Sequence, residues 1–307
     1  MPATAERDQD RWRDLREQAE RALHSAGVPD PYREARWMLE RVSGYEGAEL
    51  VASEAEPASA RAAELLAALL ERRTDGEPLQ YVLGEWSFRG LDLLVDRRVL
   101  IPRPETEVTA EIAIDEAQRL GARRAAADPW AGTTTYTIAD LGTGSGAIAL
   151  ALAAELPDAE VWATEASEDA LAVARANLAG AGHPATRVRL AAGEWFDALP
   201  AELRGRLRIV VTNPPYVAEG ELAGLAAEVR EYEPMDALVS GPSGLEAIEA
   251  VVGGAPDWLE PTGALVCEIA PQQRDAALER ARDAGFVDSR VRHDLAGRPR
   301  VLVARLG

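Results

Sequence analysis

The sequence predicts an α/β protein whose mostly parallel sheet is preceded by a small bundle of helices. From Tyr136 onward, short apolar and β-branched runs alternate with helical stretches, a rhythm typical of a parallel sheet covered on both faces. Before about residue 75, apolar residues instead recur at spacings of three and four, as on the buried face of a helix. A chain of 307 residues is long enough for one large domain and a smaller one.

Composition narrows the class of function. Hydrophobic residues make up 47% of the chain, which is typical of a globular protein rather than a disordered one. The 33 basic and 52 acidic residues leave a net charge of −19, which repels nucleic-acid phosphates, and no basic patch stands out to override it. Every basic residue is arginine, so lysine nucleophiles and Schiff bases are excluded.

The single cysteine and three scattered histidines argue against disulfides and against a His/Cys metal cluster. Cys267 lies in an apolar run that predicts a buried strand, where it acts as a small apolar side chain. The N-terminus lacks the apolar core of a signal peptide, and the longest apolar run, Ala147 to Ala154, is too short to span a membrane. We therefore expect a soluble, cytoplasmic protein without a metal.

Residues 1–75 are expected to form a helical domain with a structural or partner-docking role, because nothing in them resembles a catalytic group. Pro29-Asp30-Pro31 ends the first helix and starts the second, and Ser59 is the expected N-cap of a third. The three predicted buried stripes are Trp12, Leu15, Ala19, Ala22 and Leu23; Ala35, Met38, Leu39 and Val42; and Ala62, Leu65, Leu66, Leu69 and Leu70.

Residues 76–100 are predicted to be a β-hairpin connector, since aromatic and β-branched residues from 79 to 99 are interrupted at Arg89-Gly90. The large domain then covers 101–307 and opens with two prolines ahead of a helix, where Glu105 and Glu107 suit the positive helix end. Residues 122–135 are rich in alanine, glycine and threonine and predict a soft, mobile loop.

Within the large domain, each predicted element has its own residue range. Strands are expected near 137–141, 160–165, 186–190, 207–212, 263–269, 286–292 and 299–304, and helices near 147–155, 168–180, 244–258 and 272–284.

Gly142-Thr143-Gly144-Ser145-Gly146 follows the first of these strands and opens a helix. Three glycines within five residues let the backbone turn sharply and approach a ligand closely. Dinucleotide-binding loops and some plain turns share G-x-G-x-G. The dinucleotide fingerprint, however, wants G-x-G-x-x-G, and here the third glycine comes one residue early. The loop therefore favours S-adenosylmethionine over NAD as the ligand.

Two further residues are candidates for holding an adenosine cofactor. Glu165 ends the second strand, where an acid is placed to accept the ribose hydroxyls, although a solvated acid at a strand end is the alternative. Trp195, within Gly193-Glu194-Trp195-Phe196, follows the third strand and could flank the adenine ring, with core packing as the competing interpretation.

Asn213-Pro214-Pro215-Tyr216 is the most specific signal in the chain. It follows the apolar run 207–212, and two prolines cannot continue a central strand, so they fix the tetrapeptide at a carboxyl edge, where open α/β sheets bind ligands. A planar amide or exocyclic amine nitrogen is a poor nucleophile because its lone pair is delocalised. Carbonyls held rigidly at Asn213 Oδ1 and Pro214 can accept both of its N–H hydrogens and aim the lone pair at a sulfonium methyl group. The Tyr216 ring can pack near the flat acceptor or the sulfonium.

These motifs together resemble the bacterial protein-(glutamine-N5) methyltransferases that modify release factors, over almost the whole chain. The matching stretches are Glu77-Pro78-Leu79-Gln80-Tyr81 with Gly84 and Phe88, Leu100 to Glu107, Asp140 to Gly146, Gly193 to Phe196, Asn213 to Tyr216, Tyr232-Glu233-Pro234 and Gly244-Leu245. The Arg103-Pro104-Glu105-Thr106 element and the helical N-terminal domain separate this family from the nucleic-acid adenine methyltransferases that share Asn-Pro-Pro-Tyr.

The resemblance implies a Rossmann-like methyltransferase sheet of seven strands, the last antiparallel. It implies S-adenosylmethionine held by Gly142 to Gly146, Glu165, Trp195 and Asn213, with S-adenosylhomocysteine as product. It also implies that the acceptor is the glutamine in a Gly-Gly-Gln loop of peptide-chain release factors, bound by Asn213 to Tyr216. The N-terminal bundle would dock the release factor, and we expect the enzyme to be a monomer. Thr106 and Arg103 are expected to line the site.

The sequence departs from the family pattern at two positions. Glu165 stands in place of an expected aspartate, and Ser243 in place of an expected acid before Gly244. Both bear on affinity rather than on the methyl-transfer step.

Three alternatives remain open. The acceptor could be a glutamine of a ribosomal protein, which only the N-terminal domain discriminates. An adenine-N6 nucleic-acid methyltransferase would need a basic cleft, which the charge of −19 disfavours. A non-catalytic scaffold that binds S-adenosylmethionine would have a damaged tetrapeptide, whereas this one is intact.

Overall fold

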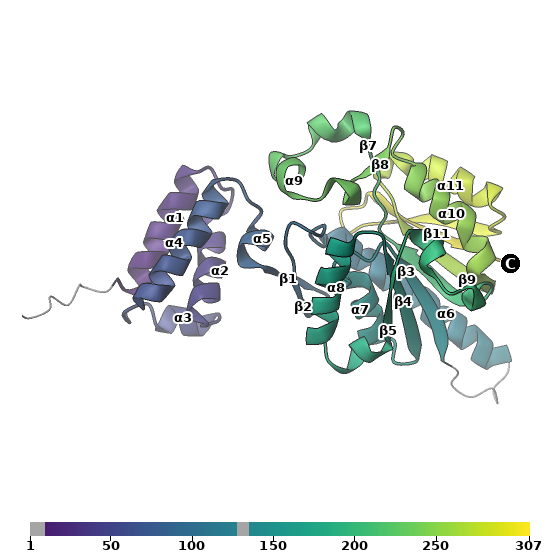
Figure 1. Cartoon of the computed structure of the whole chain (residues 1–307), viewed down its shortest axis with the longest axis horizontal. Helices are drawn as coiled ribbons and strands as arrows, with labels where there is room; N and C mark the ends of the chain where they lie inside the picture. The colour runs from purple at the N-terminus through teal and green to yellow at the C-terminus, as the bar shows by residue number, and fades with distance from the viewer. Residues whose placement is uncertain (1–9, 128–134) are drawn as a thin grey trace, which may run out of the picture. The chain divides into compact units, whose positions relative to one another are not determined.

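The computed structural model describes residues 10–127 and 135–307, which form two compact units (Figure 1). The helical unit runs to Gly84 and also takes in Ala227–Tyr232. The sheet unit comprises Glu85–Ala226 and Glu233–Gly307. The division after Gly84 differs from the predicted boundary at residue 75, and it assigns the hairpin to the sheet unit.

The helical unit contains the predicted bundle. Its helices are α1 (Trp12–Ser25), α2 (Pro31–Ser43), α3 (Ala48–Ala52), α4 (Ala60–Thr74), α5 (Leu79–Leu83) and α9 (Ala227–Tyr232). Asp30 accepts from the backbone N–H of Arg33 at the start of α2, next to Pro31. Ser59 Oγ accepts from Ala62 N at 3.1 Å, which confirms the predicted cap of α4.

The predicted buried stripes hold for most positions. Trp12, Leu15 and Leu23 of α1 share one core with Met38, Leu39, Leu66 and Leu70 of α2 and α4. Leu65 is an exception, because 44% of its surface is exposed, so its predicted inward position is wrong. Ala22, Val42 and Leu69 are only half-buried.

Segment α9, far along the chain, belongs to the helical unit through buried charge. Arg73 of α4 is 6% exposed and its guanidinium contacts Glu34 at 2.6 Å and Glu228 of α9 at 2.8 Å. Its Nη1 also donates to the carbonyl of Glu77 at 3.1 Å. A buried arginine has to be paired in this way, since an unmatched charge in an apolar interior is costly.

The sheet unit is built on a seven-stranded sheet in the order β10-β11-β9-β6-β3-β4-β5. Strands β3 (Tyr136–Leu141), β4 (Ala159–Glu165), β5 (Val188–Ala192), β6 (Leu207–Thr212) and β9 (Leu259–Glu268) are parallel to their neighbours in that set. The last strand, β11 (Pro299–Arg305), runs antiparallel to β9 and to β10 (Asp288–His293). The structure confirms the predicted fold class and all seven strands within a few residues.

Helices cover both faces of this sheet (Figure 1). One core packs α6 (Pro104–Ala127) and α7 (Ala147–Glu155) against the strands, with Leu178 of α8 (Glu168–Gly180) at its edge. The other packs α10 (Glu246–Trp258) and α11 (Arg274–Asp283). Central strands buried on both faces explain why β6 shows no polar alternation apart from Arg208 and Thr212.

A short hairpin precedes α6. Strands β1 (Glu85–Phe88) and β2 (Leu91–Leu94) pair antiparallel about Arg89-Gly90, both with positive φ, and they bury Phe88 and Leu93 in the core of the sheet unit. The predicted hairpin of 79–99 is therefore too long, because Leu79–Leu83 forms α5 and ends at the left-handed Gly84.

Two other expectations need correction. The predicted loop 122–135 is helical as far as Ala127, because α6 continues through its alanine-rich stretch, while 128–134 lie outside the described residues. The chain between β6 and α10 forms elements that no sequence pattern indicated: β7 (Val217–Ala218), β8 (Val239–Gly241), and the short 3-10 turns η4 (Glu219–Gly224) and η5 (Met235–Ala237). Further 3-10 turns are η1 (His183–Arg187), η2 (Trp195–Ala198), η3 (Ala201–Leu203) and η6 (Pro271–Gln273).

Within the described ranges, no helix combines the length and apolar content needed to cross a bilayer. Nor do the described residues bring three or more His, Cys, Asp or Glu side chains together as metal ligands. Cys267 is fully buried in β9, and burial raises the pKa of its thiol well above the ordinary value, which agrees with an apolar packing role.

Candidate active site

The two predicted motifs lie side by side at the carboxyl edge of the sheet. Strands β3 and β6 are parallel neighbours, and Leu141 pairs with Thr212 at their ends, so the next residues are Gly142 and Asn213. Thr212 Oγ1 donates to the carbonyl of Leu141 at 2.6 Å and joins the two edges. Strand order reverses here, since β4 and β6 flank β3 on opposite sides, and such a switch point is where open α/β sheets bind ligands.

The glycine loop is held by backbone and by a buried acid. The N–H groups of Gly142 and Thr143 both donate to the carbonyl of Thr164 at 2.9 Å. Asp140 Oδ2 accepts from Thr143 Oγ1 at 2.6 Å and from Ala149 N at 3.1 Å, one of the free donors in the first turn of α7. Burial raises the pKa of Asp140 to about 7. Asp140 belongs to one of the stretches that match the family, but no sequence pattern indicated this role.

Gly142 cannot carry a side chain in this arrangement. Its φ of +72° lies in the left-handed region, and a Cβ there would lie 3.3 Å from the Trp195 ring. Trp195 itself has φ of +44°, a strained value for an aromatic residue and one that is held by its surroundings. Phe196 stacks on Trp258 in the core, whereas Trp195 both packs on that core and lines the cavity, so its position agrees with both interpretations given for it.

Glu165 ends β4 beside this loop, as predicted, and its carboxylate is turned toward backbone donors. Oε2 accepts from Gly144 N at 2.8 Å and Oε1 from Ser167 N at 3.0 Å. Ser167 in turn caps α8 through Oγ, which accepts from Ala170 N. Because a carboxylate oxygen has two lone pairs, each keeps one for a ligand hydroxyl.

Asn213 has one satisfied and one unsatisfied side-chain atom. Its Nδ2 donates to Thr106 Oγ1 at 3.2 Å. Its Oδ1 is buried and, among the residues the structure describes, has no hydrogen-bond partner. Buried acceptors without partners are rare and costly in folded proteins, so this oxygen marks a place where a ligand donor is expected.

Hydrogen bonds from Gln273 hold the backbone that follows Asn213 in place. Gln273 Nε2 donates to the carbonyl of Tyr216 at 2.9 Å and to that of Gly244 at 2.8 Å. Gly244 has φ of +78°, and a Cβ there would lie 2.8 Å from the Tyr216 carbonyl oxygen. The close approach of the Gly244 and Tyr216 backbones therefore explains why glycine stands in the Gly244-Leu245 pair, one of the stretches that match the family.

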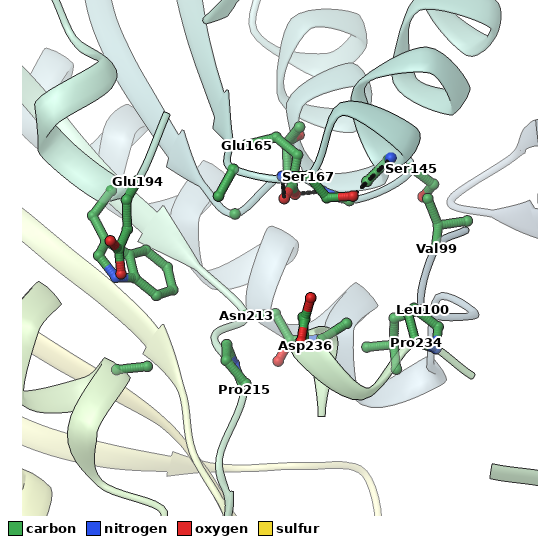
Figure 2. Close-up of a pocket in the computed structure, with 18 of the residues that line it drawn as sticks. Val99, Leu100, Ser145, Glu165, Ser167, Glu194, Asn213, Pro215, Pro234 and Asp236 are labelled. Atoms are coloured by element: carbon green, nitrogen blue, oxygen red, sulfur yellow. Dashed lines mark hydrogen bonds between the residues drawn. The ribbon is translucent and has the colours of Figure 1, made fainter. Parts of the chain in front are cut away.

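A cavity of about 620 Å³ lies between the two motifs and is large enough for a cofactor (Figure 2). Figure 2 shows Glu165 and Ser167 across the cavity from Asn213 and Asp236. The structure brings most of the predicted site residues to its wall: Gly142, Thr143, Gly144, Ser145, Glu165, Trp195, Asn213 and Pro215.

Three predicted residues do not line that cavity. Gly146 is the N-cap of α7, and Pro214 is buried. Tyr216 instead lines a neighbouring hollow of about 550 Å³, together with Arg300, and burial raises the pKa of its phenol to about 12. The structure thus places the Tyr216 ring beside the main cavity wall rather than in it.

The sequences of the curated proteins settle the family. The chain is 39% identical to "Release factor glutamine methyltransferase" of Cereibacter sphaeroides over 92% of this chain and 94% of that protein. It is 41% identical to the protein of the same name from Moorella thermoacetica, covering 94% and 95% of the two chains. The chain belongs to the release factor glutamine methyltransferase family.

Two family models match parts of the chain. Residues 14–84 match "PrmC N-terminal domain" and residues 107–230 match "Methyltransferase small domain". The first match ends where the helical unit gives way to the sheet unit. The resemblance inferred from the motifs is confirmed, and membership makes the chain a methyltransferase.

A solved structure supports the fold. The catalytic domain of human Mettl16, in complex with MAT2A 3'UTR hairpin 6, aligns over 80% of this chain and 81% of that chain, with a TM-score of 0.51. At 15% identity this likeness shows the methyltransferase fold alone.

Several residues of the methyltransferase site were missed or misplaced by the sequence analysis. Thr106 lines the cavity as expected, but Arg103 does not, because its guanidinium pairs with the buried Glu233. Glu233 Oε2 also accepts from Ile101 N at 3.3 Å, which explains the Tyr232-Glu233-Pro234 motif. Among the wall residues that were given no role, Val99 and Leu100 follow the hairpin, and Pro234, Asp236 and Ala237 lie at or just before η5. Leu100 and Pro234 belong to stretches that match the family, whereas the other three only lie close to such stretches in the sequence.

Proposed function

We propose that this methyltransferase moves a methyl group from S-adenosylmethionine to the side-chain N5 of a glutamine, in the Gly-Gly-Gln loop of peptide-chain release factors. The observation that carries the proposal is the unpaired, buried Oδ1 of Asn213 on the wall of the cavity. A carboxamide NH2 is a donor of the kind that this oxygen needs. The names of the curated relatives support a release factor as the bearer of that glutamine.

The cavity fits S-adenosylmethionine on three grounds. Its volume suits a nucleoside cofactor, the left-handed Gly142 leaves room beside the Trp195 ring, and Glu165 keeps free acceptor capacity. We infer that Gly142 to Ser145, Glu165, Trp195 and Asn213 hold the cofactor, while Gly146, the N-cap of α7, ends the loop. When bound, it supplies an electrophilic sulfonium methyl group.

The protein's own contribution to the chemistry is positioning. Asn213 Oδ1 accepts an N–H hydrogen of the acceptor amide, which fixes the nitrogen and raises its electron density. The expected second acceptor, the Pro214 carbonyl, belongs to a buried residue outside the cavity wall. The two prolines restrict the backbone that follows Asn213, and Gln273 holds the carbonyls of Tyr216 and Gly244 just beyond them. No general base is required, because the nitrogen gives up its proton only after it has gained the methyl group.

We further propose that the helical unit binds the release factor. We also propose that the enzyme is a monomer and that it acts in the cytoplasm, where translation takes place. An acceptor glutamine on a ribosomal protein is the alternative within the same chemistry. The net charge of −19 still disfavours a nucleic-acid acceptor.

The test is incubation with methyl-labelled S-adenosylmethionine and purified release factor, beside a release factor whose loop glutamine is changed to alanine. We expect label in the first protein and none in the second. Label in both would mean that the acceptor is another residue. Label in neither, with transfer to a ribosomal protein, would favour the alternative.

A further inference from the structure

A buried carboxylate lies behind Asn213. Glu268 ends β9 and is 1% exposed, and it contacts the first turns of α6 through two threonines, Thr106 and Thr109, which are 4% and 0% exposed. Thr109 Oγ1 donates to Glu268 Oε2 at 3.1 Å, and Thr106, one turn earlier on α6, is the other hydroxyl that stabilises the ionised carboxylate and lowers its pKa. Neither the motifs nor the family resemblance gave Glu268 a role.

The directions of these hydrogen bonds form a chain. Asn213 Nδ2 donates to Thr106 Oγ1, which uses that oxygen as an acceptor. A hydroxyl has one hydrogen, and an ionised carboxylate only accepts, so the Thr106 hydrogen is committed to Glu268. The chain therefore runs from Asn213 through Thr106 to Glu268 and leaves Asn213 Oδ1 as the atom that faces the ligand.

We propose that Glu268 is a positioning residue for methyl transfer, acting through Thr106 to hold the Asn213 amide with its oxygen toward the acceptor nitrogen. This rests on the proposed function. If the Asn213 amide turned over, Oδ1 would meet an oxygen whose only hydrogen is already used, and two acceptors would face each other. The ionised form of Glu268 thus selects one of two amide orientations that have nearly the same shape.

The surroundings of Glu268 allow its charge to matter near neutral pH. Burial raises the pKa of Glu268 to about 7, against the two threonine hydrogen bonds and the charge of Arg300 on β11, while Glu105 on α6 raises it further. Tyr216 and Cys267 also face Glu268. Burial raises the pKa of the Tyr216 phenol and of the Cys267 thiol, so neither group ionises near pH 7. Protonated Glu268 can donate to Thr106, and the direction of the chain is then no longer fixed.

The activity test uses Glu268→Gln, which keeps the shape but can donate a hydrogen. We expect kcat at saturating S-adenosylmethionine and release factor to fall about 10- to 100-fold, the usual effect of losing a group that orients a functional one, with KM for the cofactor little changed. Wild-type kcat should fall as pH drops through about 7, and this limb should be absent from the variant. Glu279→Gln, at an exposed position on α11, is the matched control and should behave as wild type.

Thr106 gives a second pair of variants. Thr106→Val removes the hydroxyl and should lower kcat about as much as Glu268→Gln. Thr106→Ser restores an oxygen at the same place and should lose much less. Equal losses for valine and serine would indicate a packing role and overturn the proposal.

A measurement on the protein without cofactor or release factor separates this inference from the proposed function. The chain has two asparagines, Asn177 and Asn213, so labelling with ¹⁵N-asparagine gives two side-chain NH2 groups, and Asn213→Ala assigns them. We expect the Asn213 amide resonances to move with a midpoint near pH 7 in the wild type and to stop moving in Glu268→Gln. If they titrate equally in both, Asp140 is the cause and the inference fails. Lack of methyl transfer by the wild-type protein would instead refute the proposed function.

Discussion

The glycine-loop half of the site and the asparagine half use buried carboxylates in different ways. In the glycine-loop half, Asp140 accepts from a hydroxyl and a backbone N–H, and Glu165 from two backbone N–H groups. In the asparagine half, Glu268 fixes Thr106, and the chain ends at Asn213 Oδ1, which has no partner in the described part of the protein. One half is shaped to receive a ligand's surface, and the other presents a single acceptor to it.

The difference between the two halves indicates which residues should contribute to ligand binding and which to the methyl-transfer step. Groups whose hydrogen bonds are complete before binding hold the ligand-binding backbone in place, and their loss should weaken binding. A group left unpaired until the substrate arrives contributes most in the transition state, and its loss should lower kcat.

The largest expected effect follows removal of the unpaired acceptor. Asn213→Ala should lower kcat by about 10²–10³-fold, the range found when one preorganised electrostatic contact is lost. Affinity for S-adenosylmethionine, measured by calorimetry, should fall much less. A variant with intact turnover would contradict the assignment of Asn213.

Stability should depend on pH through the two buried carboxyl groups. The pKa values of Asp140 and Glu268 are raised by burial to about 7 from 3.8 and 4.5. Between the lower values and about 7, the folded state holds protons that the unfolded state has released, so the free energy of unfolding falls as pH rises through this window. With about two pH units between pH 5 and these raised values and about 1.36 kcal/mol per unit, the two groups together should lose on the order of 5 kcal/mol, measured by urea unfolding from pH 5 to pH 8.

Acids with lowered pKa values act in a different range. The Arg98 hydrogen bond lowers the pKa of Asp96 below 3.8, so its stabilising contribution is lost only when pH falls below that value. Stability that rose steadily from pH 5 to pH 8 would contradict the raised values of Asp140 and Glu268.

The glycine-loop half can be tested at Asp140. Asp140→Leu leaves Thr143 Oγ1 and Ala149 N without their acceptor and should raise the Kd for S-adenosylmethionine about tenfold, with a smaller effect on kcat at saturation. Asp140→Asn keeps one oxygen and is the matched control. If kcat fell while Kd stayed constant, the division of labour between the halves would be wrong.

The smallest effect is expected at the helix cap beside Glu165. Ser167→Ala removes the acceptor for Ala170 N and should lower stability by about 1 kcal/mol, seen as a few degrees in Tm. Because Ser167 also lines the cavity, saturating S-adenosylmethionine should widen this difference if the hydroxyl is itself a ligand and leave it unchanged if it is not.

The sequence predicted the sheet and both edge motifs because these are local patterns. β-branched runs, a glycine loop and a double proline each carry their structural meaning within a few residues. Thr106, Asn213 and Glu268 come from three distant segments, and only the pairing of β6 with β9 and the packing of α6 on both bring them together. A glutamate at the end of an apolar run gives no sign of its partners.

The same limit explains the other differences. Glu165 was correctly placed, but the turn of its carboxylate toward Gly144 and Ser167 depends on the loop geometry. The apolar spacing could not tell that Leu65 faces outward, since neighbouring leucines already fill the core. Helix α6 ran past its predicted end because alanine favours helix and the packing of Leu120 extends it.

The membership of α9 in the helical unit has a practical consequence for dissecting the enzyme. A protein cut after Gly84 would still carry residues 227–232, whose Glu228 would have lost Arg73. The N-terminal piece, for its part, would retain a buried guanidinium with one counter-ion fewer. Each fragment would therefore lack one partner of this ion pair, and we expect that mixing the two separately made pieces restores it.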